Sequence, residues 1–418
     1  MDQFERKTPI EHVLLRPDTY VGNVIAESAE RFVVDPLTNK MVLRTVSFVP
    51  AFLKIVDEIL VNAADNAQRD PTMNKLWVVC TAEGSVSVFN NGRGLPIVVH
   101  EKENIYVPEL VFGVLLTGSN FKDSDKRTCG GRNGFGAKLT NIFSSRFTVE
   151  TADSSRQLSY TQTWSDNMSV KSEPVIRKTR ANQKDYTKIT FSPDFQKFSM
   201  PTGTIAEEVV LLLRRRVFDL AATLPRVKVK FNNEPLQLKG FSDFVGMFTD
   251  RPVVYYRNCE NQRWQIAITT SAGIGFQHQS FVNNINTRNG GRHVAYIADQ
   301  VVQFVLKHLK KKLPVLKPVH VRDHLFLFVS CLIENPAFDT QTKTSMVTHR
   351  KSFGSTCVLP DAVLTKLVRS TDLVENISKR THVHEDKILK KTDGKKKGRL
   401  LGIPKLNDAN WAGTKHSK

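Results

Sequence analysis

The sequence GGRNGFGAKL, at residues 130–139, places four glycines within seven positions and sets Arg132 and Lys138 beside them. Glycine at this density indicates backbone that takes positive φ values or comes very close to another group. A phosphate suits such a loop, because bare N–H groups and nearby cations bind anionic oxygens. Two common phosphate motifs are excluded: an alanine separates the last glycine from the lysine of a G-x-x-x-x-G-K-[ST] loop, and the glycines reverse the order of G-x-G-x-x-G. The stretch therefore predicts a phosphate loop of another kind.

Basic residues exceed acidic ones in this chain of 418 residues, whose net charge is +19. From residue 301 onward, 23 lysines and arginines stand against 10 aspartates and glutamates. This excess favours a polyanionic partner such as nucleic acid. A solvated basic segment, with GKKKGR at 394–399 as a linker or a nuclear address, is the alternative interpretation.

Chain length and cysteine use narrow the class of protein. The length predicts two or three domains with ordinary cores. The five cysteines are scattered and form no C-x-x-C pair, which favours a reducing compartment over a structural zinc site. No apolar run approaches the roughly 18 residues of a membrane span, and the charged N-terminus lacks a signal-peptide pattern. We therefore expect no membrane attachment.

Hydrophobic periodicity divides the chain into two parts near residue 223. The first part is expected to contain helices over 50–69, 107–116 and 205–224, and strands over 76–81, 86–90, 146–152, 158–164 and 187–191. The second is expected to contain strands over 226–231, 252–257, 263–270 and 324–333, and a helix over about 293–312 that ends in Lys310, Lys311 and Lys312.

Polar residues gather on one side of the first helix. Glu58 and Asn62 are four residues apart, and Asp65 and Asn66 follow one turn later. A carboxylate there is suited to orienting or deprotonating water, and an amide oxygen to completing a Mg²⁺ shell made otherwise of phosphate oxygens and water. An ordinary solvated face is the alternative, although such a face usually mixes charge signs.

The turn NNGRG, at residues 90–94, follows a predicted strand. Asn90 at the strand end would accept a hydrogen bond from an exocyclic amine, and the two glycines would let backbone approach a flat ring. Arg93 would brace a carboxylate of the preceding helix. Taken alone, the motif is common turn chemistry.

Three motifs follow one another within about 80 residues: E-x-x-x-N on a helix, N-x-G-x-G after a strand, and a glycine-rich loop that opens a helix. In this order the chain resembles the ATPase superfamily shared by type IIA topoisomerases, heat-shock chaperones, histidine kinases and mismatch-repair ATPases. Within it, the chain is similar to the N-terminal ATPase and transducer region of eukaryotic-type DNA topoisomerase II. The stretches that carry this resemblance run from about residue 6 to 410 and are KTPIEHVLLRPDTYVGN, DEILVNAADNAQRD, FNNGRGLPIV, LLTGSN, GGRNGFGAKLTNIFS, FVNNINTRNGGRHV, IENPAFDTQTK and GIPKLNDAN.

The resemblance implies an α+β fold in two domains. Residues 1–222 would form a two-layer α/β sandwich, the Bergerat or GHKL type of ATPase domain, with an N-terminal strap. Residues 223–404 would form a smaller transducer domain with the fold of ribosomal protein S5 domain 2. Residues 405–418 would be a linker toward a DNA-cleavage core.

The resemblance also implies roles for single residues. Glu58 would be the general base for the attacking water, and Asn62 would be the Mg²⁺ ligand. Gln341 and Lys343 would reach the γ-phosphate from the second domain and take part in catalysis. The residues expected to contact ATP are Asn62, Asp65, Asn66, Asn90, Arg93, Gly118, Ser119, Asn120, Gly131, Arg132, Asn133, Gly134, Phe135, Gly136, Ala137, Lys138, Thr187, Gln341, Thr342 and Lys343.

By the same resemblance, the glycine-rich stretch is an ATP lid. Its N–H groups would wrap the β- and γ-phosphates where the next helix begins, and a helix N-terminus carries unpaired donors and a partial positive charge. Lys138 would add a full charge. Asn90 and Thr187 would contact the adenine.

The implied function is that of an ATP-operated gate. Two protomers would meet through their N-terminal straps when ATP and Mg²⁺ bind, and the closed homodimer would hold a DNA duplex for strand passage, relaxation or decatenation by the full-length enzyme. This chain would hydrolyse ATP, with stimulation by DNA, and would not cleave DNA. Lys310, Lys311 and Lys312 would face the duplex. The nucleus is the expected location, with an organellar DNA compartment as the alternative.

Three positions depart from the family pattern. Phe4 stands where the strap carries a tyrosine that reaches the partner's nucleotide, so that hydroxyl bond is missing. Gly118 replaces a more usual serine, and the lysine loop at 310–312 is short. His293, in GGRHV, is expected to be a packed turn residue and not a catalytic group.

Two other functions remain open. A chaperone-type ATPase of the same superfamily would bind client proteins through its second domain; the QTK sequence at 341–343 and the lysine-tipped helix argue against it. A DNA-binding module with a vestigial nucleotide pocket is the second alternative, and the retained Glu58 and Asn62 argue against that one.

Overall fold

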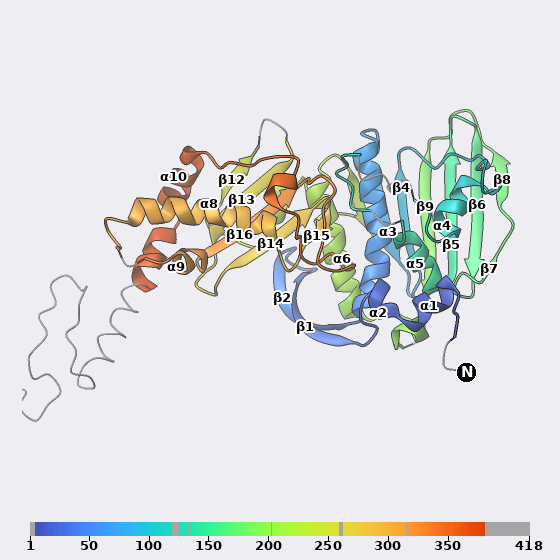
Figure 1. Cartoon of the computed structure of the whole chain (residues 1–418), viewed down its shortest axis with the longest axis horizontal. Helices are drawn as coiled ribbons and strands as arrows, with labels where there is room; N and C mark the ends of the chain where they lie inside the picture. Colours follow the sequence, from blue (N-terminus) through green and yellow to red (C-terminus); the bar gives the residue numbers. More distant parts are fainter. Residues whose placement is uncertain are drawn as a thin grey trace, which may run out of the picture.

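The computed structural model describes residues 5–118, 125–131, 134–201, 203–258, 262–314 and 316–380. Within these ranges the chain forms two mixed β-sheets, each covered by helices, and a two-stranded ribbon (Figure 1). The α+β class expected from the sequence is therefore confirmed.

The larger sheet belongs to the N-terminal part, and its described strands number nine. The neighbouring strands, in order, are β11 (Glu234–Pro235), β10 (Lys228–Phe231), β3 (Lys75–Cys80), β4 (Val86–Asn91), β9 (Tyr186–Pro193), β5 (Ser144–Asp153), β6 (Leu158–Ser165) and β7 (Val170–Lys171), with β8 (Val175–Lys178) also paired to β6. Four helices form a layer on this sheet: α3 (Pro50–Arg69), α4 (Val107–Gly113), α5 (Gly136–Ile142) and α6 (Glu207–Thr223). Two short helices, α1 (Pro9–Leu15) and α2 (Pro17–Tyr20), precede them.

Helix α3 lies at the centre of the helical layer (Figure 1). Pro50 occupies its first turn, where the fixed φ of proline favours helix and no N–H partner is lost. The apolar residues that recur at helical spacing, among them Phe52, Ile55 and Ile59, are buried against the sheet. The prediction of a helix over 50–69 is confirmed, and burial of this stripe fixes which face is left for Glu58.

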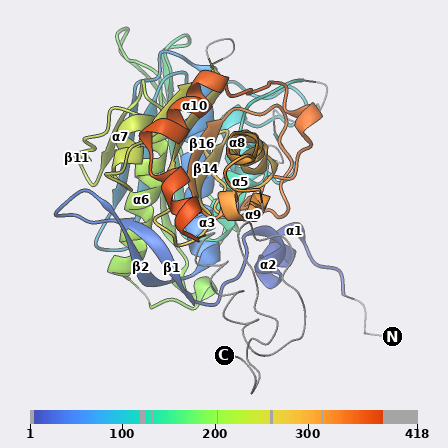
Figure 2. The same cartoon turned by 90° about the vertical axis from the view of Figure 1, so that its left-hand side faces the viewer.

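The smaller sheet belongs to the C-terminal part, and its described strands number five. In order they are β12 (Val254–Arg257), β13 (Trp264–Thr270), β16 (Leu325–Cys331), β14 (Gln277–Val282) and β15 (Ile285–Asn286). One face is covered by α8 (Arg292–Leu309), α9 (Pro318–Arg322) and α10 (Asp361–Ser370). Figure 2 shows these helices in front of the sheet.

A third core joins the two parts of the chain. It holds aromatic side chains from α6, from α7 (Phe241–Gly246) and from the second sheet, together with the ribbon β1 (Glu27–Val34) and β2 (Met41–Phe48). Phe244 of α7 and Phe281 of β14 pack with ring centroids 5.6 Å apart. Both faces of β16 are consequently buried, which explains why the sequence there is continuously apolar.

The strand expected at 226–231 lies in a different sheet from the one that the sequence suggested. β10 pairs in parallel with β3, with Phe231 opposite Val78, and so extends the first sheet. Periodicity predicts a strand but carries no information about its partner, so the sheet could not be assigned from the residues alone. The domain division near residue 223 stays a prediction.

The lysine-tipped helix is slightly shorter than expected. α8 ends at Leu309, and Lys310 is its C-cap. No helix in the described part of the chain is both long and apolar enough to cross a membrane. The basic stretch at 394–399 and the linker expected at 405–418 lie outside the described residues.

Candidate functional site

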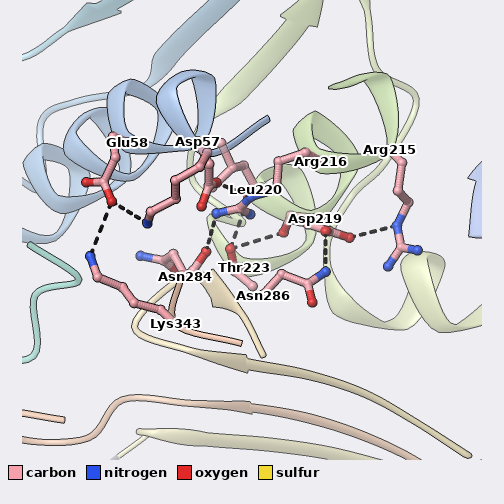
Figure 3. A network of polar contacts seen from close by, with 11 residues as sticks. Asp57, Glu58, Arg215, Arg216, Asp219, Leu220, Thr223, Asn284, Asn286 and Lys343 are labelled. Carbon is pink, nitrogen blue, oxygen red and sulfur yellow. Dashed lines mark hydrogen bonds and ion pairs between the residues drawn. The ribbon is translucent and has the colours of Figure 1, made fainter. Parts of the chain in front are cut away.

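The centre of the site is Glu58, which α3 presents toward the second part of the chain. Its side chain is buried and forms an ion pair with Lys54, one helical turn earlier. Lys343, from the loop after β16, lies on the other side, with its Nζ 3.6 Å from Glu58 Oε1 (Figure 3). A carboxylate on α3 and a lysine from the second part of the chain are thus brought together, while the expected contact of Lys343 with the γ-phosphate stays a prediction.

The electrostatics of Glu58 follow from these neighbours. Burial alone would raise its pKa, but Lys343 and Lys54 outweigh burial and lower the pKa to about 2. Burial lowers the pKa of Lys54, and Glu58 opposes that change. The group is therefore a fully ionised carboxylate held in one place by two cations, in a region where charge interactions are strong.

Lys54 was missed by the sequence analysis. The predicted polar face of α3 begins at Glu58, whereas Lys54 forms its ion pair from one turn earlier. The i, i+4 spacing of a lysine and a glutamate was the available signal. Its burial was not predictable, because it depends on what covers α3.

Asp65 fixes the start of the glycine-rich stretch. Its carboxylate accepts hydrogen bonds from Gly130 N at 2.7 Å and from Gly131 N at 2.8 Å. Burial raises the pKa of Asp65, although the two N–H donors act in the opposite direction. Lys343 Nζ donates to Gly130 O at 3.2 Å. The stretch is therefore anchored to both α3 and Lys343, and direct contact of Asp65 with ATP stays a prediction.

The glycines of this stretch are required by close packing around α5. A Cβ at Gly136 would overlap the Glu58 carboxylate, and a Cβ at Gly134, where φ is +66°, would overlap Thr117 O. Lys138 is buried, and its Nζ donates to the carbonyls of Thr117 and Gly134. Burial lowers the pKa of Lys138 to about 8. In this structure Lys138 thus ties the stretch to residue 117, and its expected contact with phosphate stays a prediction.

Two residues expected at the adenine are brought together across the sheet. Asn90 at the end of β4 is buried and lies opposite Thr187 of β9. Thr187 lies in turn opposite Thr151 of β5, with the two hydroxyl oxygens 3.3 Å apart. An amide and two hydroxyls therefore form one polar row on neighbouring strands.

The two glycines of NNGRG are required by close packing within the protein. A Cβ at Gly92, where φ is +103°, would meet Met73 at 2.8 Å, and a Cβ at Gly94 would overlap Ala152 O. Protein atoms thus occupy the Cβ positions of both glycines as the turn crosses β5, and the approach of this backbone to a flat ring stays a prediction. Arg93 is held through its backbone: its N–H donates to Asp70 Oδ2 at 2.6 Å.

The remaining amides of α3 differ in exposure. Asn62 is exposed and lies near Gly131, where a Cβ would be 3.7 Å from Asn62 Oδ1. Asn66 is half-buried, and its Nδ2 donates to Arg93 O at 3.3 Å. No cluster of three or more His, Cys, Asp or Glu residues able to hold a metal occurs among the described residues. An exposed amide oxygen beside a phosphate-type loop does fit Mg²⁺, which takes few protein ligands when phosphate supplies the others.

The segment that carries Lys343 adopts a tight turn. Lys343 has a φ of +58°, and its N–H donates to Thr340 O at 3.0 Å. Thr344 O accepts from Asn289 N at 2.9 Å, and Asn289 Nδ2 donates to Thr344 Oγ1 at 3.2 Å. This turn aims Lys343 at α3, while Gln341 and Thr342 are half-buried beside it.

The remaining expected residues fall into two groups: those outside the described residues, and those described away from Glu58. Ser119, Asn120, Arg132, Asn133 and Phe4 lie outside the described residues. Gly118 is exposed, Phe135 is the N-cap of α5, and Ala137 is buried within it. Lys310, Lys311 and Lys312 are exposed at the end of α8 and form no ion pair with a described residue.

His293 is a packed residue in the first turn of α8, as expected. It is fully buried, and its Nε2 lies 3.1 Å from Thr287 Oγ1. Burial, with a contribution from His278, lowers its pKa to about 3. The ring is therefore neutral and structural.

The chain is similar in sequence and fold to several known proteins. The profile of the family described as DNA gyrase B matches residues 239–397. The ATPase and transducer domains of DNA topoisomerase II from Balamuthia mandrillaris have 44% identical sequence and a TM-score of 0.88, with 92% of this chain and 99% of that chain covered. The ATPase region of topoisomerase II from Saccharomyces cerevisiae is 41% identical, with a TM-score of 0.85 and 91% and 99% coverage.

A longer relative has the same similarity. DNA topoisomerase 2 top-2 of Caenorhabditis elegans is 44% identical over the whole of this chain. The chain spans 28% of the length of that protein. The structural matches confirm the two-part GHKL-type architecture that the sequence motifs predicted.

Proposed function

Because this chain belongs to the DNA topoisomerase II family, as its ATPase and transducer region, we propose that it binds and hydrolyses ATP to operate a gate for duplex DNA. One observation carries the proposal. Lys343, in the loop after β16 of the second sheet, forms an ion pair with Glu58 of α3, the helix that packs on the first sheet. Residues from both parts of the chain would therefore form a single active site.

In the proposed reaction, Glu58 takes a proton from the water that attacks the γ-phosphate. A carboxylate with a pKa of about 2 is a weak base, so the present pairing does not favour proton uptake. Transfer of Lys343 Nζ from Glu58 to the γ-phosphate would remove the cation that lowers this pKa most, and would make Glu58 more basic. Lys54 would remain and keep the carboxylate oriented. ATP binding and activation of the base are thus linked through Lys343.

Mg²⁺ is the proposed cofactor, and Asn62 is the residue proposed to hold it. The metal would supply charge neutralisation at the phosphate oxygens. Residues 130–138 are proposed as the lid over the phosphates, with Gln341 and Lys343 at the γ-phosphate. Asn90 and Thr187, which lie opposite each other in the sheet, are proposed to contact the adenine.

The wider assembly is also a proposal. Two chains would dimerise through their N-terminal segments when ATP binds, and the closed gate would hold DNA for strand passage by the longer protein, in the nucleus. The net charge of +19 supports a polyanionic partner. The structure supports a domain division a little later than residue 223, after β11, because β10 and β11 extend the first sheet.

Steady-state ATP hydrolysis, measured with and without duplex DNA, tests the function. We expect turnover that needs Mg²⁺ and rises when DNA is added. Turnover that does not change when DNA is added, with no salt-dependent DNA binding, would favour the chaperone-type alternative. DNA binding without turnover would favour a vestigial nucleotide pocket.

A further inference from the structure

Arg216 of α6 contacts both parts of the chain at once. Its Nε donates to Asp57 Oδ1 at 2.5 Å, and its Nη2 donates to Asn284 O at 2.8 Å (Figure 3). Asp57 is the residue before Glu58 on α3, and Asn284 lies in the turn between β14 and β15. The Arg216 side chain is 12% exposed, so both bonds form where water competes weakly. One planar guanidinium therefore joins the helix of the proposed base to the second sheet.

The β14–β15 hairpin is also attached to other parts of the first unit. Asn283 and Asn284 have φ values of +50° and +63°, which suits a two-residue hairpin turn built from asparagines. Asn283 Nδ2 donates to Cys129 O at 3.2 Å, at the start of the glycine-rich stretch. Asn286 Nδ2 donates to Asp219 Oδ2 of α6 at 2.8 Å. The hairpin is thus held by α6 and touches the proposed lid.

A short path leads from this hairpin to Lys343. The chain that leaves β15 reaches Asn289, whose N–H and Nδ2 both donate to Thr344. Thr344 is the residue after Lys343, whose Nζ lies 3.6 Å from Glu58 Oε1. The two ends of this path, Asp57 and Glu58, are neighbours on α3. Arg216 closes a ring of contacts that runs from α3 through the hairpin and back to α3.

The space around this ring makes these polar contacts important. A cavity of about 380 Å³ lies between α3, α6, the β1–β2 ribbon and the second sheet, and Lys54, Asp57, Arg216, Thr342 and Thr344 are among the residues that line it. Continuous apolar packing is therefore missing at this point. The Arg216 bonds therefore contribute to the distance between the hairpin and α3, together with the buried side chains of Ile285 and Val61, which both pack against Gly130.

We propose that Arg216 is a positioning residue for ATP hydrolysis. By bonding Asp57 and Asn284 O together, it fixes the β14–β15 hairpin, and with it Lys343, relative to Glu58. This inference rests on the proposed function of Glu58 and Lys343. Arg216 touches neither of those side chains and acts through the placement of the turn that carries Lys343. A small displacement of a reacting group is enough to reduce turnover strongly.

Substitution in two backgrounds tests the proposal. In the otherwise unchanged chain, Arg216→Gln is expected to lower kcat by up to about 10²-fold, while KM for ATP and the affinity for ADP change little. Arg216→Lys keeps the charge but has one donor atom in place of the planar guanidinium, so its kcat should lie between those of the parent and of Arg216→Gln. In a Lys343→Ala background, Arg216→Gln should lower kcat further by less than about twofold, because the lysine side chain that Arg216 positions is already absent.

Controls separate placement from folding. Arg214→Gln removes the same charge from the same helix, and the Arg214 guanidinium lies over Phe218, 6.0 Å from the ring centroid; this variant should keep the parent kcat. Thermal unfolding of each variant shows whether it folds, and Arg216→Lys replaces Arg216→Gln in the cycle if the latter does not.

The outcomes distinguish the proposed function of Lys343 from the positioning role of Arg216. If Lys343→Ala alone leaves kcat intact, the proposed function of Lys343 fails. If Lys343→Ala lowers kcat but Arg216→Gln lowers it equally in both backgrounds, Lys343 keeps its function and the positioning inference is overturned. An equal loss of ADP affinity and kcat in Arg216→Gln would also overturn it, because that pattern indicates a general disturbance of the site.

Discussion

Lysines occur in two very different settings in the second part of this chain. Lys343 is 8% exposed and lies between Glu58 and Gly130 O, whereas Lys310, Lys311 and Lys312 are exposed at the end of α8. The buried cation acts on one carboxylate at short range, where the surroundings screen little. The exposed cations act together on any polyanion nearby, and salt screens them.

This difference predicts how each region responds to change. A substitution at the Glu58 site should alter a single step strongly and with little dependence on salt. A substitution at the end of α8 should leave hydrolysis without DNA unchanged and alter a salt-dependent affinity for DNA. The following predictions, from the largest expected effect on turnover to the smallest, test whether the two regions are as separate as their surroundings indicate.

Replacement of the proposed base should have the largest effect. Glu58→Gln keeps the shape of the side chain but cannot accept the proton, so turnover should fall by about 10²–10⁴-fold. ATP binding should persist, because the lid and sheet residues are unchanged. Steady-state hydrolysis and equilibrium ATP binding measure the two effects. Turnover within about threefold of the parent would show that Glu58 is not the base, since a positioned base contributes far more.

Removal of the buried lysine should come next. Lys343→Ala is expected to lower hydrolysis on the order of 10²-fold, as for loss of one charge-stabilising donor. ADP affinity should stay nearly unchanged, because ADP has no γ-phosphate. Turnover and binding of both nucleotides provide the measurement. Equal losses for ATP and ADP would mean that Lys343 supports the fold of the site and not the γ-phosphate.

The second cation at Glu58 should have a smaller, pH-dependent effect. In Lys54→Met, burial of Glu58 is opposed by Lys343 alone, so the pKa of Glu58 should rise from its present value of about 2. Because the ionised carboxylate is the active form, turnover is lost as the pH falls through this pKa. The acid limb of the pH–rate profile should therefore move to higher pH by about one to three units.

Lys54→Arg is the matched control for that shift. It keeps a positive charge four residues before Glu58, so its acid limb should stay close to that of the parent. If both variants lose activity equally at every pH, Lys54 contributes packing and not charge.

The sequence predicted the residues of the Glu58 site better than their partners. Glu58 and Lys343 follow from motifs, because their chemistry requires a particular residue type. The burial of Lys54, the pairing of β10 with β3 and the contact of Asn283 with Cys129 O depend on which surfaces meet in three dimensions. No local pattern encodes such meetings, since they are settled by tertiary packing.

The glycines illustrate the same limit. Their number and spacing predicted that other groups come very close to the glycine backbone, and such close contacts are found at Gly94 and Gly136. At Gly94 the neighbour is the backbone of Ala152, which the sequence did not predict, and the expected approach to a nucleotide ring stays a prediction. A glycine indicates that space is scarce, but the residue itself does not tell what occupies that space.

The exposed lysines provide the smallest expected effect on turnover. Replacing Lys310, Lys311 and Lys312 together with alanine should leave hydrolysis without DNA unchanged. If each pairs with a phosphate, the slope of log affinity against log salt should flatten by about two to three units. DNA stimulation of hydrolysis should fall as well. The C-terminal helix dipole offsets some of the repulsion among these charges, so their clustering alone does not require an anion.

A matched loss of charge elsewhere shows whether position matters. Arg177, Lys178 and Arg180 are also exposed, in or next to β8, at the opposite end of the molecule from α8 (Figure 1). Their triple alanine variant lowers the net charge by the same amount. If DNA recognises the end of α8, only the α8 variant should flatten the salt slope. Equal flattening by both variants would mean that net charge alone attracts DNA, and parallel curves for parent and α8 variant would exclude these lysines from the DNA contact.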